Sequence, residues 1–250
     1  MLIPKDFFPT ALSRAAMTNQ IPQLSLVIPV YNERDCIRPL IDEIDIALAG
    51  RLRYEVVVVD DASVDGTTDV LGDLSRTHET LQVKLHVENR GQSAAILTGV
   101  KAASAPVIAV LDGDGQNDPA DVPCLYERLC ASTQIRMVVG ERHRRKDGRL
   151  KLFSSRVANA VRRRILKDGI KDTGCGLKVF YRDDFLRLPA FDHMHRFMPA
   201  LIQRGGGEVA SVPVNHRPRL YGVSKYGVNN RLWVGIVDLL GVMWLKRRRI

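Results

Sequence analysis

Four short segments of the chain are rich in Val, Ile and Leu and show little alternation between apolar and polar residues. They cover residues 24–30, 55–59, 83–87 and 107–111. Strands with this pattern are buried on both faces, as in a parallel sheet. The intervening segments carry apolar residues three or four positions apart, which predicts helices over residues 37–48, 67–76 and 93–103. This alternation predicts an α/β fold with a mostly parallel sheet flanked by helices. Further strands are expected over residues 137–140, 177–180 and 209–214.

The composition is that of a globular protein with a basic surface. Its 250 residues suffice for one large α/β domain or two small ones, and its formal net charge is +9. A positive charge of this size favours polyanionic partners such as nucleotides, nucleic acid or phospholipid surfaces. Aromatic residues are 6% of the chain and are not interleaved with the basic run as stacking platforms, so no nucleic-acid partner is expected. The four cysteines show no metal-binding spacing, which suits the cytosol.

The two ends of the chain differ in character. Residues 1–22 lack the pattern of a signal peptide and are expected to be a lead-in. Residues 232–245 are almost uncharged, but as a helix they would be about 21 Å long, short of the roughly 30 Å hydrocarbon core of a bilayer. With Trp233, Trp244 and the basic residues 246–249 they predict an interfacial helix on a membrane surface. The alternative is a core or oligomer-interface helix that ends in a solvated basic tail.

Acidic residues follow the expected strands, at the sheet edge where open α/β folds bind ligands. Asp112 and Asp114 come after the fourth strand and, two residues apart on an extended strand end, would face one ion. Gln116 offers a further oxygen. Oxygen ligands without nearby His or Cys favour Mg²⁺ or Mn²⁺. The alternative is an Asx- and Gly-rich turn without a metal.

The first two strands also lead into polar residues. Tyr31 could stack on a base and Glu33 could bind a ribose, although Glu33 could instead belong to the first turn of a helix. Asp60 and Asp61 could accept hydrogen bonds from a base or a ribose. For Ser63 and Asp65 a turn and capping role is favoured.

A basic segment follows the acidic ones, with 12 Lys or Arg among residues 142–171. It is interpreted either as a solvated helix face or as a positive wall that faces phosphates or a lipid surface.

Taken in order, the segments "LSLVIPVYNE", "VVVVDDASVDGT", "ENRGQSAAILTGVKAA" and "VLDGDGQNDP" closely resemble the nucleotide-binding half of family 2 glycosyltransferases. Three later segments, "GERHRRKDG", "DTGCGLKVFYRD" and "RPRLYGVSKYGV", resemble the dolichol-phosphate mannosyltransferase and polyprenyl-phosphate sugar synthase branch. The larger members of that family carry a C-terminal pair of transmembrane helices, which this sequence is expected to lack.

The resemblance implies a GT-A fold, a UDP- or GDP-hexose donor, a polyprenyl phosphate acceptor and a divalent ion. Asp112, Asp114 and Gln116 would hold the ion. The nucleoside pocket would be lined by Pro29, Tyr31, Glu33, Asp60 and Asp61. Contacts to the diphosphate or the acceptor would come from Arg142 and Arg156, and contacts to the acceptor phosphate from Arg219, Ser224 and Lys225, with Arg217 as a partial substitute for Arg219. Residues 23–217 would form the catalytic domain, and residues 218–250 an acceptor loop and the C-terminal helix.

The acceptor phosphate would attack without a general base and invert the anomeric carbon, because a phosphate monoester is already an anion near neutral pH. Asp172 is expected near the sugar, to orient hydroxyls or assist the acceptor, or else as a turn residue. The expected site of action is the cytoplasmic face of a membrane, and homo-oligomers are possible. The alternative within the class is a soluble family 2 glycosyltransferase that acts on a sugar hydroxyl of a cell-surface glycan. A metal-dependent nucleotidyltransferase is disfavoured, because the first strand leads into "PVYNE" instead of a Gly-rich phosphate loop.

Overall fold

A computed structural model describes residues 21–142, 162–219 and 229–248, with the backbone alone for residues 229–234. Seven strands form one sheet: β1 (Leu24–Val30), β2 (Tyr54–Asp60), β3 (Leu81–Leu85), β4 (Val107–Val110), β5 (Ile135–Arg142), β6 (Lys178–Tyr181) and β7 (Glu208–Val214). The helices include α2 (Arg34–Leu48), α3 (Thr67–Thr77), α4 (Gln92–Ala102), α5 (Val122–Cys130), α7 (Arg182–Leu186), α8 (Met198–Arg204) and α9 (Asn229–Arg247). Short 3₁₀ turns lie at Pro119–Asp121 and Met194–Arg196.

The strand order is β3-β2-β1-β4-β6-β5-β7. Strands β1 to β4 pair in parallel, with Val27 opposite both Val57 and Val110. Strand β6 runs antiparallel to β4 and β5 on its two sides, and β5 pairs in parallel with β7. Strands β1, β2, β4, β5 and β7 therefore all run the same way, and their carboxyl ends meet at one edge of the sheet.

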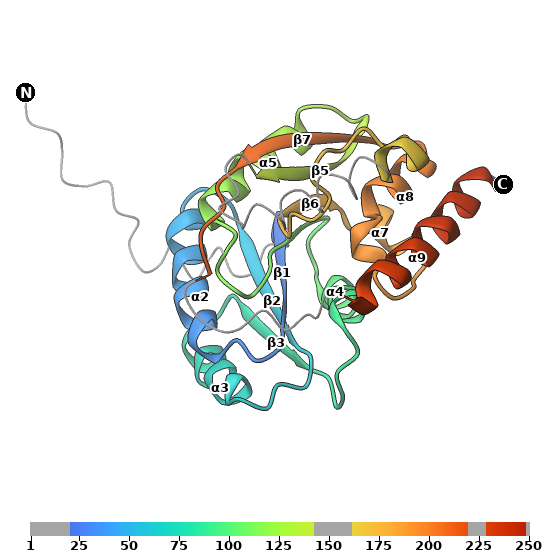
Figure 1. The fold of residues 1–250 in the computed structure, drawn as a ribbon. Coiled ribbons are helices and arrows are strands. Elements are labelled where there is room, and N and C mark those ends of the chain that lie inside the picture. The colour runs from blue at the N-terminus through green and yellow to red at the C-terminus, as the bar shows by residue number, and fades with distance from the viewer. Residues whose placement is uncertain (1–20, 143–161, 220–228, 249–250) are drawn as a thin grey trace, which may run out of the picture.

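Helices cover both faces of this sheet (Figure 1). One core cluster joins alternate strand residues such as Leu26 and Val56 to apolar residues of α2, α3 and α5. A second cluster joins the opposite strand residues, such as Val27 and Val57, to α4, α7 and α8. Helix α9 lies outside α8, where Val242 packs among Leu166, Phe197, Ala200 and Leu201.

The expected α/β fold is confirmed. All seven expected strands and two of the three expected helices have bounds within two residues of those observed, and α2 begins at Arg34, three residues before its expected start. Strand β3 covers Leu81–Leu85 and so lies two residues before the segment expected at residues 83–87. It pairs with β2 alone, and the last pair is Asp60 with Leu85. Val87 is 99% exposed, so its apolar side chain does not mark a buried strand.

No helix in the described part of the chain is long and apolar enough to span a bilayer. The division of the chain at residues 22 and 217 stays a prediction, as do the lead-in and most of the acceptor loop, which lie outside the described residues.

Candidate active site

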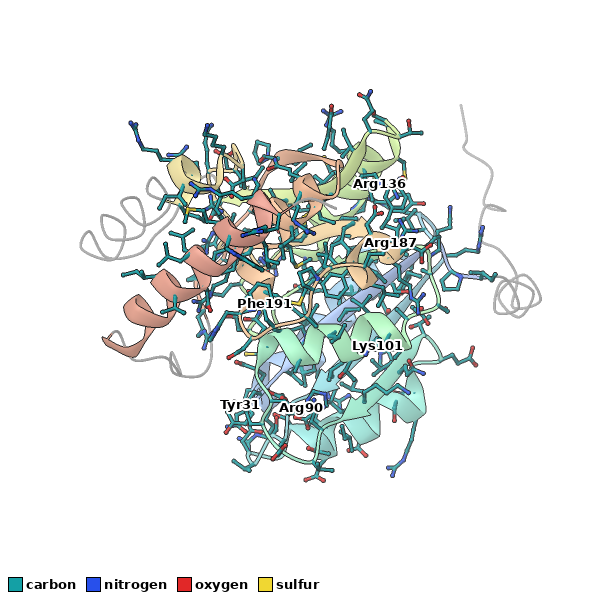
Figure 2. The ribbon with its side chains drawn as sticks, turned by 90° about the vertical axis from the view of Figure 1, so that its right-hand side faces the viewer. Tyr31, Arg90, Lys101, Arg136, Arg187 and Phe191 are labelled. Carbon is teal, nitrogen blue, oxygen red and sulfur yellow. The ribbon has the colours of Figure 1, made fainter. Side chains whose placement is uncertain are left out.

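The expected polar residues gather at the carboxyl edge of the sheet. Glu33 follows β1, Asp61 follows β2, Asp112 follows β4, and Arg142 ends β5. Figure 2 shows Tyr31 and Arg90 at this end of the molecule, away from Lys101, Arg136 and Arg187 at the other end. Segments that are separate in the sequence thus contribute to one site.

A turn holds the two central carboxylates. The sequence suggested that Asp112 and Asp114 lie on one face of an extended strand, and this was wrong. Strand β4 ends at Val110, before both residues. Asn117 Oδ1 accepts the Asp112 backbone N–H at 3.1 Å, and Asp114 Oδ1 accepts the Gln116 N–H at 3.1 Å. Asp118 instead caps the turn at residues 119–121. The turn, and not strand geometry, brings Asp112 and Asp114 together.

The charges of the pair favour a cation. Burial and the nearby charge of Asp114 raise the pKa of Asp112 to about 6. Among the described side chains, the neutral amide of Gln92 donates to the Asp112 carboxylate, from Nε2 to Oδ1 at 2.8 Å. Asp114 Oδ2 accepts from the Arg219 guanidinium at 2.5 Å, so a cation already lies on this carboxylate. No group of three His, Cys, Asp or Glu side chains in the described residues is placed so that it could hold a metal ion. Two carboxylates alone suit a Mg²⁺ or Mn²⁺ ion that keeps positions for water and substrate phosphate.

Glycine at position 176 allows a close approach to this pair. A Cβ added to Gly176 would lie 2.1 Å from Asp112 Oδ2 and 2.8 Å from Asn117 Oδ1. No side chain fits there unless Asp112 moves. The backbone of the "DTGCG" segment therefore forms one wall of the site.

A third carboxylate near the acidic pair, Asp172, is tightly paired with an arginine. Arg142 donates to Asp172 through Nε and Nη2, both at 2.7 Å, and the two side chains are 11% and 9% exposed. A Cβ at Gly174 would lie 3.1 Å from Arg142 Nη2, so this glycine leaves room for the pair. The structure thus joins the end of β5 to the segment before β6. A bidentate guanidinium–carboxylate pair of this kind is a strong, oriented interaction.

Asp60 and Asp61 have donors from the protein. Asp60 accepts from the Ser63 N–H at 2.9 Å and the Thr68 hydroxyl at 2.5 Å. Asp61 accepts from the N–H groups of Arg90 and Gly91 at 2.9 and 2.8 Å and contacts His86 Nδ1 at 2.6 Å. They shape the loops that would surround a nucleoside, and their contact with it stays a prediction, as does that of Pro29 and Tyr31.

The turn role favoured for Ser63 and Asp65 is present in the structure. Ser63 Oγ accepts the Asn32 N–H, and Asp65 accepts the N–H groups of Arg34 and Thr67. The Thr67 hydroxyl in turn accepts the Glu33 N–H at 2.9 Å. Glu33 lies directly before α2 and is 9% exposed.

The other residues expected to bind the metal ion or the substrate phosphates are either held by protein partners or lie outside the described part of the chain. Gln116 donates its side-chain amide to the Arg217 carbonyl oxygen at 3.3 Å. Arg217 is bound to Glu43 and Asp118, at 2.5 and 2.8 Å, so it is not placed to substitute for Arg219. Arg156, Ser224 and Lys225 lie outside the described residues.

Beside Asp112 lies a cavity of about 240 Å³ whose polar lining the sequence did not single out. Lys178, His195 and Arg196 contribute to it. Burial holds the pKa of the His195 imidazole well below its usual range, and the positive charges of Lys178 and Arg196 lower it further. The imidazole is therefore neutral. A charged residue within the apolar run "LKVFY" was the available signal for Lys178, because lysine is rarely buried without a reason.

A larger cavity, of about 310 Å³, lies at the opposite end of the sheet, beside Arg136 and Arg187 (Figure 2). It contains none of the expected site residues.

Comparison with known proteins gives relatives for both sequence and fold. Residues 25–188 match the model of glycosyl transferase family 2. The chain is 35% identical over 230 residues to the dodecaprenyl-phosphate galacturonate synthase of Rhizobium johnstonii, which covers 90% of this chain and 68% of that protein. It is 34% identical over 212 residues to the undecaprenyl-phosphate 4-deoxy-4-formamido-L-arabinose transferase of Edwardsiella ictaluri, with 82% and 63% covered. The chain thus spans about two thirds of the length of these curated relatives.

Two solved structures share the fold. Glucosyl-3-phosphoglycerate synthase from Mycobacterium tuberculosis, in complex with Mn²⁺, UDP and glucosyl-3-phosphoglycerate, superposes with a TM-score of 0.66 at 17% identity. The match covers 98% of this chain and 86% of that one. A mannosyltransferase from Pyrobaculum calidifontis in complex with GDP-Man and Mn²⁺ has a TM-score of 0.65 at 23% identity, with 93% and 66% covered.

Proposed function

The chain belongs to glycosyl transferase family 2 and has the GT-A fold, and from this we propose that it transfers a sugar from a nucleotide donor to a polyprenyl phosphate. Both curated relatives are named for transfer to a polyprenyl phosphate, but for different sugars. The solved neighbours hold UDP in one case and GDP-Man in the other. We propose a UDP- or GDP-sugar donor and a divalent ion, Mg²⁺ or Mn²⁺.

One observation carries the proposal: an acidic pair and a set of arginines meet at one edge of the sheet. Asp112 and Asp114 suit a metal that binds the donor diphosphate, with Gln116 beside them. Arg219 reaches Asp114, and the charge of Arg142 acts on Asp112. A site that brings a nucleoside diphosphate and a phosphate monoester together needs both signs of charge, because the two substrates repel each other.

The acceptor phosphate supplies its own nucleophile. One of its oxygens forms a bond to the anomeric carbon of the sugar while the bond from that carbon to the donor's diphosphate oxygen breaks, and the nucleoside diphosphate leaves with the electron pair. In-line attack inverts the anomeric carbon. A divalent ion, when bound, would stabilise charge on the departing diphosphate. Arg219 and Lys225 would neutralise the attacking phosphate, and Ser224 from the acceptor loop would contact it.

The pairing of Asp172 with Arg142 favours a phosphate acceptor over a sugar hydroxyl. Attack by a hydroxyl needs a general base, and Asp172 is the carboxylate expected beside the sugar. Both of its oxygens accept hydrogen bonds from Arg142. A carboxylate held by a guanidinium is a poor proton acceptor, so Asp172 is better suited to orient Arg142 than to act as a base.

The proposal is tested by incubating the protein with Mn²⁺, a polyprenyl phosphate and each of four labelled donors: UDP-glucose, UDP-galacturonate, UDP-N-acetylglucosamine and GDP-mannose. We expect label from one donor to enter the organic phase, and to do so only with the lipid phosphate present. A water-soluble glycan product formed without lipid would favour the hydroxyl-acceptor alternative.

Helix α9 offers a surface for the membrane that holds such an acceptor. One face packs on the protein through Leu239, Val242 and Met243. The other face exposes Ile236 (40%), Val237 (55%), Leu240 (50%) and Trp244 (58%). Arg247 and Arg248 follow and are exposed. The helix thus packs on the protein, and its exposed apolar stripe with basic residues at its end supports the interfacial contact with a membrane that we propose.

Flotation with liposomes tests this surface, which we place at the cytoplasmic face of the membrane. Replacing Leu240 and Trp244 with Gln should reduce flotation with anionic liposomes at least tenfold. Replacement of Val64, which is 85% exposed and lies between β2 and α3, with Gln is the control. Equal flotation of all three proteins would rule out α9 as the contact.

A further inference from the structure

The cavity beside Asp112 adjoins the place where the donor diphosphate would bind, so under the proposed function it takes the sugar. Its volume of about 240 Å³ is below that of pockets for drug-sized ligands and suits a single sugar unit. It lies between the α4 start, where Gln92 contributes, and the segments before β6 and α8.

Lys178 gives this cavity an unusual charge. Its side chain is 5% exposed and lies in β6 between β4 and β5, opposite Val110 and Val139. The ammonium donates to the Cys175 carbonyl oxygen, a neutral acceptor. Within the described residues it forms no ion pair with a carboxylate. Burial lowers the pKa of Lys178, and the charge of Asp112, which lines the same cavity, acts against this shift without forming an ion pair. A ligand carboxylate bound beside Lys178 would favour its charged form further.

Arg196 and His195 add hydrogen-bond donors to the same wall. Arg196 is half-buried, and its guanidinium also lacks an ion pair within the described parts of the chain. The His195 backbone N–H donates to Ser93 Oγ at 3.3 Å, and His195 Nδ1 lies 2.8 Å from the same hydroxyl. If the hydroxyl donates to Nδ1, the neutral imidazole carries its proton on Nε2, and that nitrogen is a donor as well.

We propose that this cavity binds a carboxylate on the transferred sugar, so that the donor is a nucleotide-linked uronic acid and not the neutral hexose. The inference rests on the proposed function and specifies its substrate. Lys and Arg side chains have donors and no acceptor, whereas a carboxylate has acceptors only. A hydroxymethyl group would satisfy neither charge. Charge-assisted hydrogen bonds of this kind discriminate strongly between a carboxylate and a hydroxyl.

The test compares donors that differ only at C6 of the sugar, which is a carboxylate in the uronate and a hydroxymethyl group in the neutral hexose. Binding to the full chain with Mn²⁺ is measured by calorimetry for UDP-galacturonate against UDP-galactose, UDP-glucuronate against UDP-glucose, and GDP-mannuronate against GDP-mannose, with UDP and GDP alone as references. We expect one uronate to bind at least about tenfold more tightly than its neutral partner. A neutral hexose that binds as well as its uronate in every pair would overturn the inference and leave the proposed function standing. If no nucleotide or nucleotide sugar binds, both are overturned.

Variants separate sugar recognition from diphosphate binding. Arg196→Gln should bring the uronate preference to within about threefold of unity while the affinity for the free nucleotide changes less than twofold. Arg196→Lys should retain part of the preference because it keeps the charge. Arg187→Gln makes the same change on an exposed residue at the other end of the sheet and should have no effect. Weaker binding of nucleotide, hexose and uronate by the same factor in Arg196→Gln would assign Arg196 to the diphosphate and overturn the inference.

Discussion

Gly176 offers a direct test of the acidic pair, because its replacement acts on one carboxylate. The Cβ of Gly176→Ala would lie 2.1 Å from Asp112 Oδ2 and 2.4 Å from Asp112 Cγ, where ordinary contacts begin near 3.4 Å. Gly176 has no positive φ, so the backbone accepts alanine without strain. The carboxylate must therefore move by about 1.3 Å. Movement is opposed by Gln92 on Oδ1 and by Asn117 on the backbone N–H.

The expected cost has two parts. Overpacking of this kind destabilises a protein by roughly 1–3 kcal/mol. In a chain of this size each kcal/mol lowers the melting temperature by roughly 2–4 °C. A shift of about 1 Å in a catalytic group costs about 100-fold in rate. Activity should thus fall far more than stability.

The assay measures sugar transfer to polyprenyl phosphate, nucleotide binding with and without Mn²⁺, and the melting temperature. Gly72→Ala is the matched control, because a Cβ there meets nothing within 4 Å and the residue lies within helix α3. That variant should melt slightly higher, since alanine favours a helix over glycine by about 1 kcal/mol. If Gly176→Ala retains its Mn²⁺-dependent nucleotide binding and at least half of its turnover, Asp112 does not act from the position described.

Three other substitutions probe the charges of the site. Asp114→Asn should abolish turnover and lower the Mn²⁺-dependent part of donor affinity more than tenfold in calorimetry with and without EDTA, and full activity at saturating Mn²⁺ would contradict the metal role. Arg219→Ala should raise the KM for polyprenyl phosphate or lower kcat more than tenfold, because a hydrogen bond to a charged group contributes about 1.5–3 kcal/mol. The matched control, Arg217→Ala, removes a side chain that is bound to Glu43 and should change the KM and kcat by less than threefold. Arg142→Met removes the guanidinium that donates to both oxygens of the buried Asp172 and should cost about 3–5 kcal/mol in urea unfolding. A loss below about 1 kcal/mol would show that the pair contributes little.

The sequence predicted the first half of the fold well because its signals there are local. Strands β1 and β2 are continuous apolar runs, and α2 repeats apolar residues on one face. Strand order is not a local property, so nothing in residues 177–180 indicated that β6 would run antiparallel between β4 and β5. That insertion brings Lys178 beside Asp112, and it explains why the cavity at Asp112 was missed while the acidic pair was found.

Carboxylates at strand ends illustrate a further limit of sequence interpretation. Asp61 and Asp112 both follow apolar strands and were both assigned to ligands. In the structure Asp61 accepts from the backbone N–H groups of Arg90 and Gly91 and lies against His86. These partners of Asp61 lie 25 to 30 positions further along the chain. Asp112 receives one neutral amide on its side chain and lies near a second carboxylate. Two acids alike in sequence thus differ in their need for a cation, because that need depends on how many donors the fold brings to each oxygen. The metal prediction for Asp112 and Asp114 gains support from this comparison, whereas a role for Asp61 in nucleoside binding would have to share oxygens that the loop at residues 89–91 already uses.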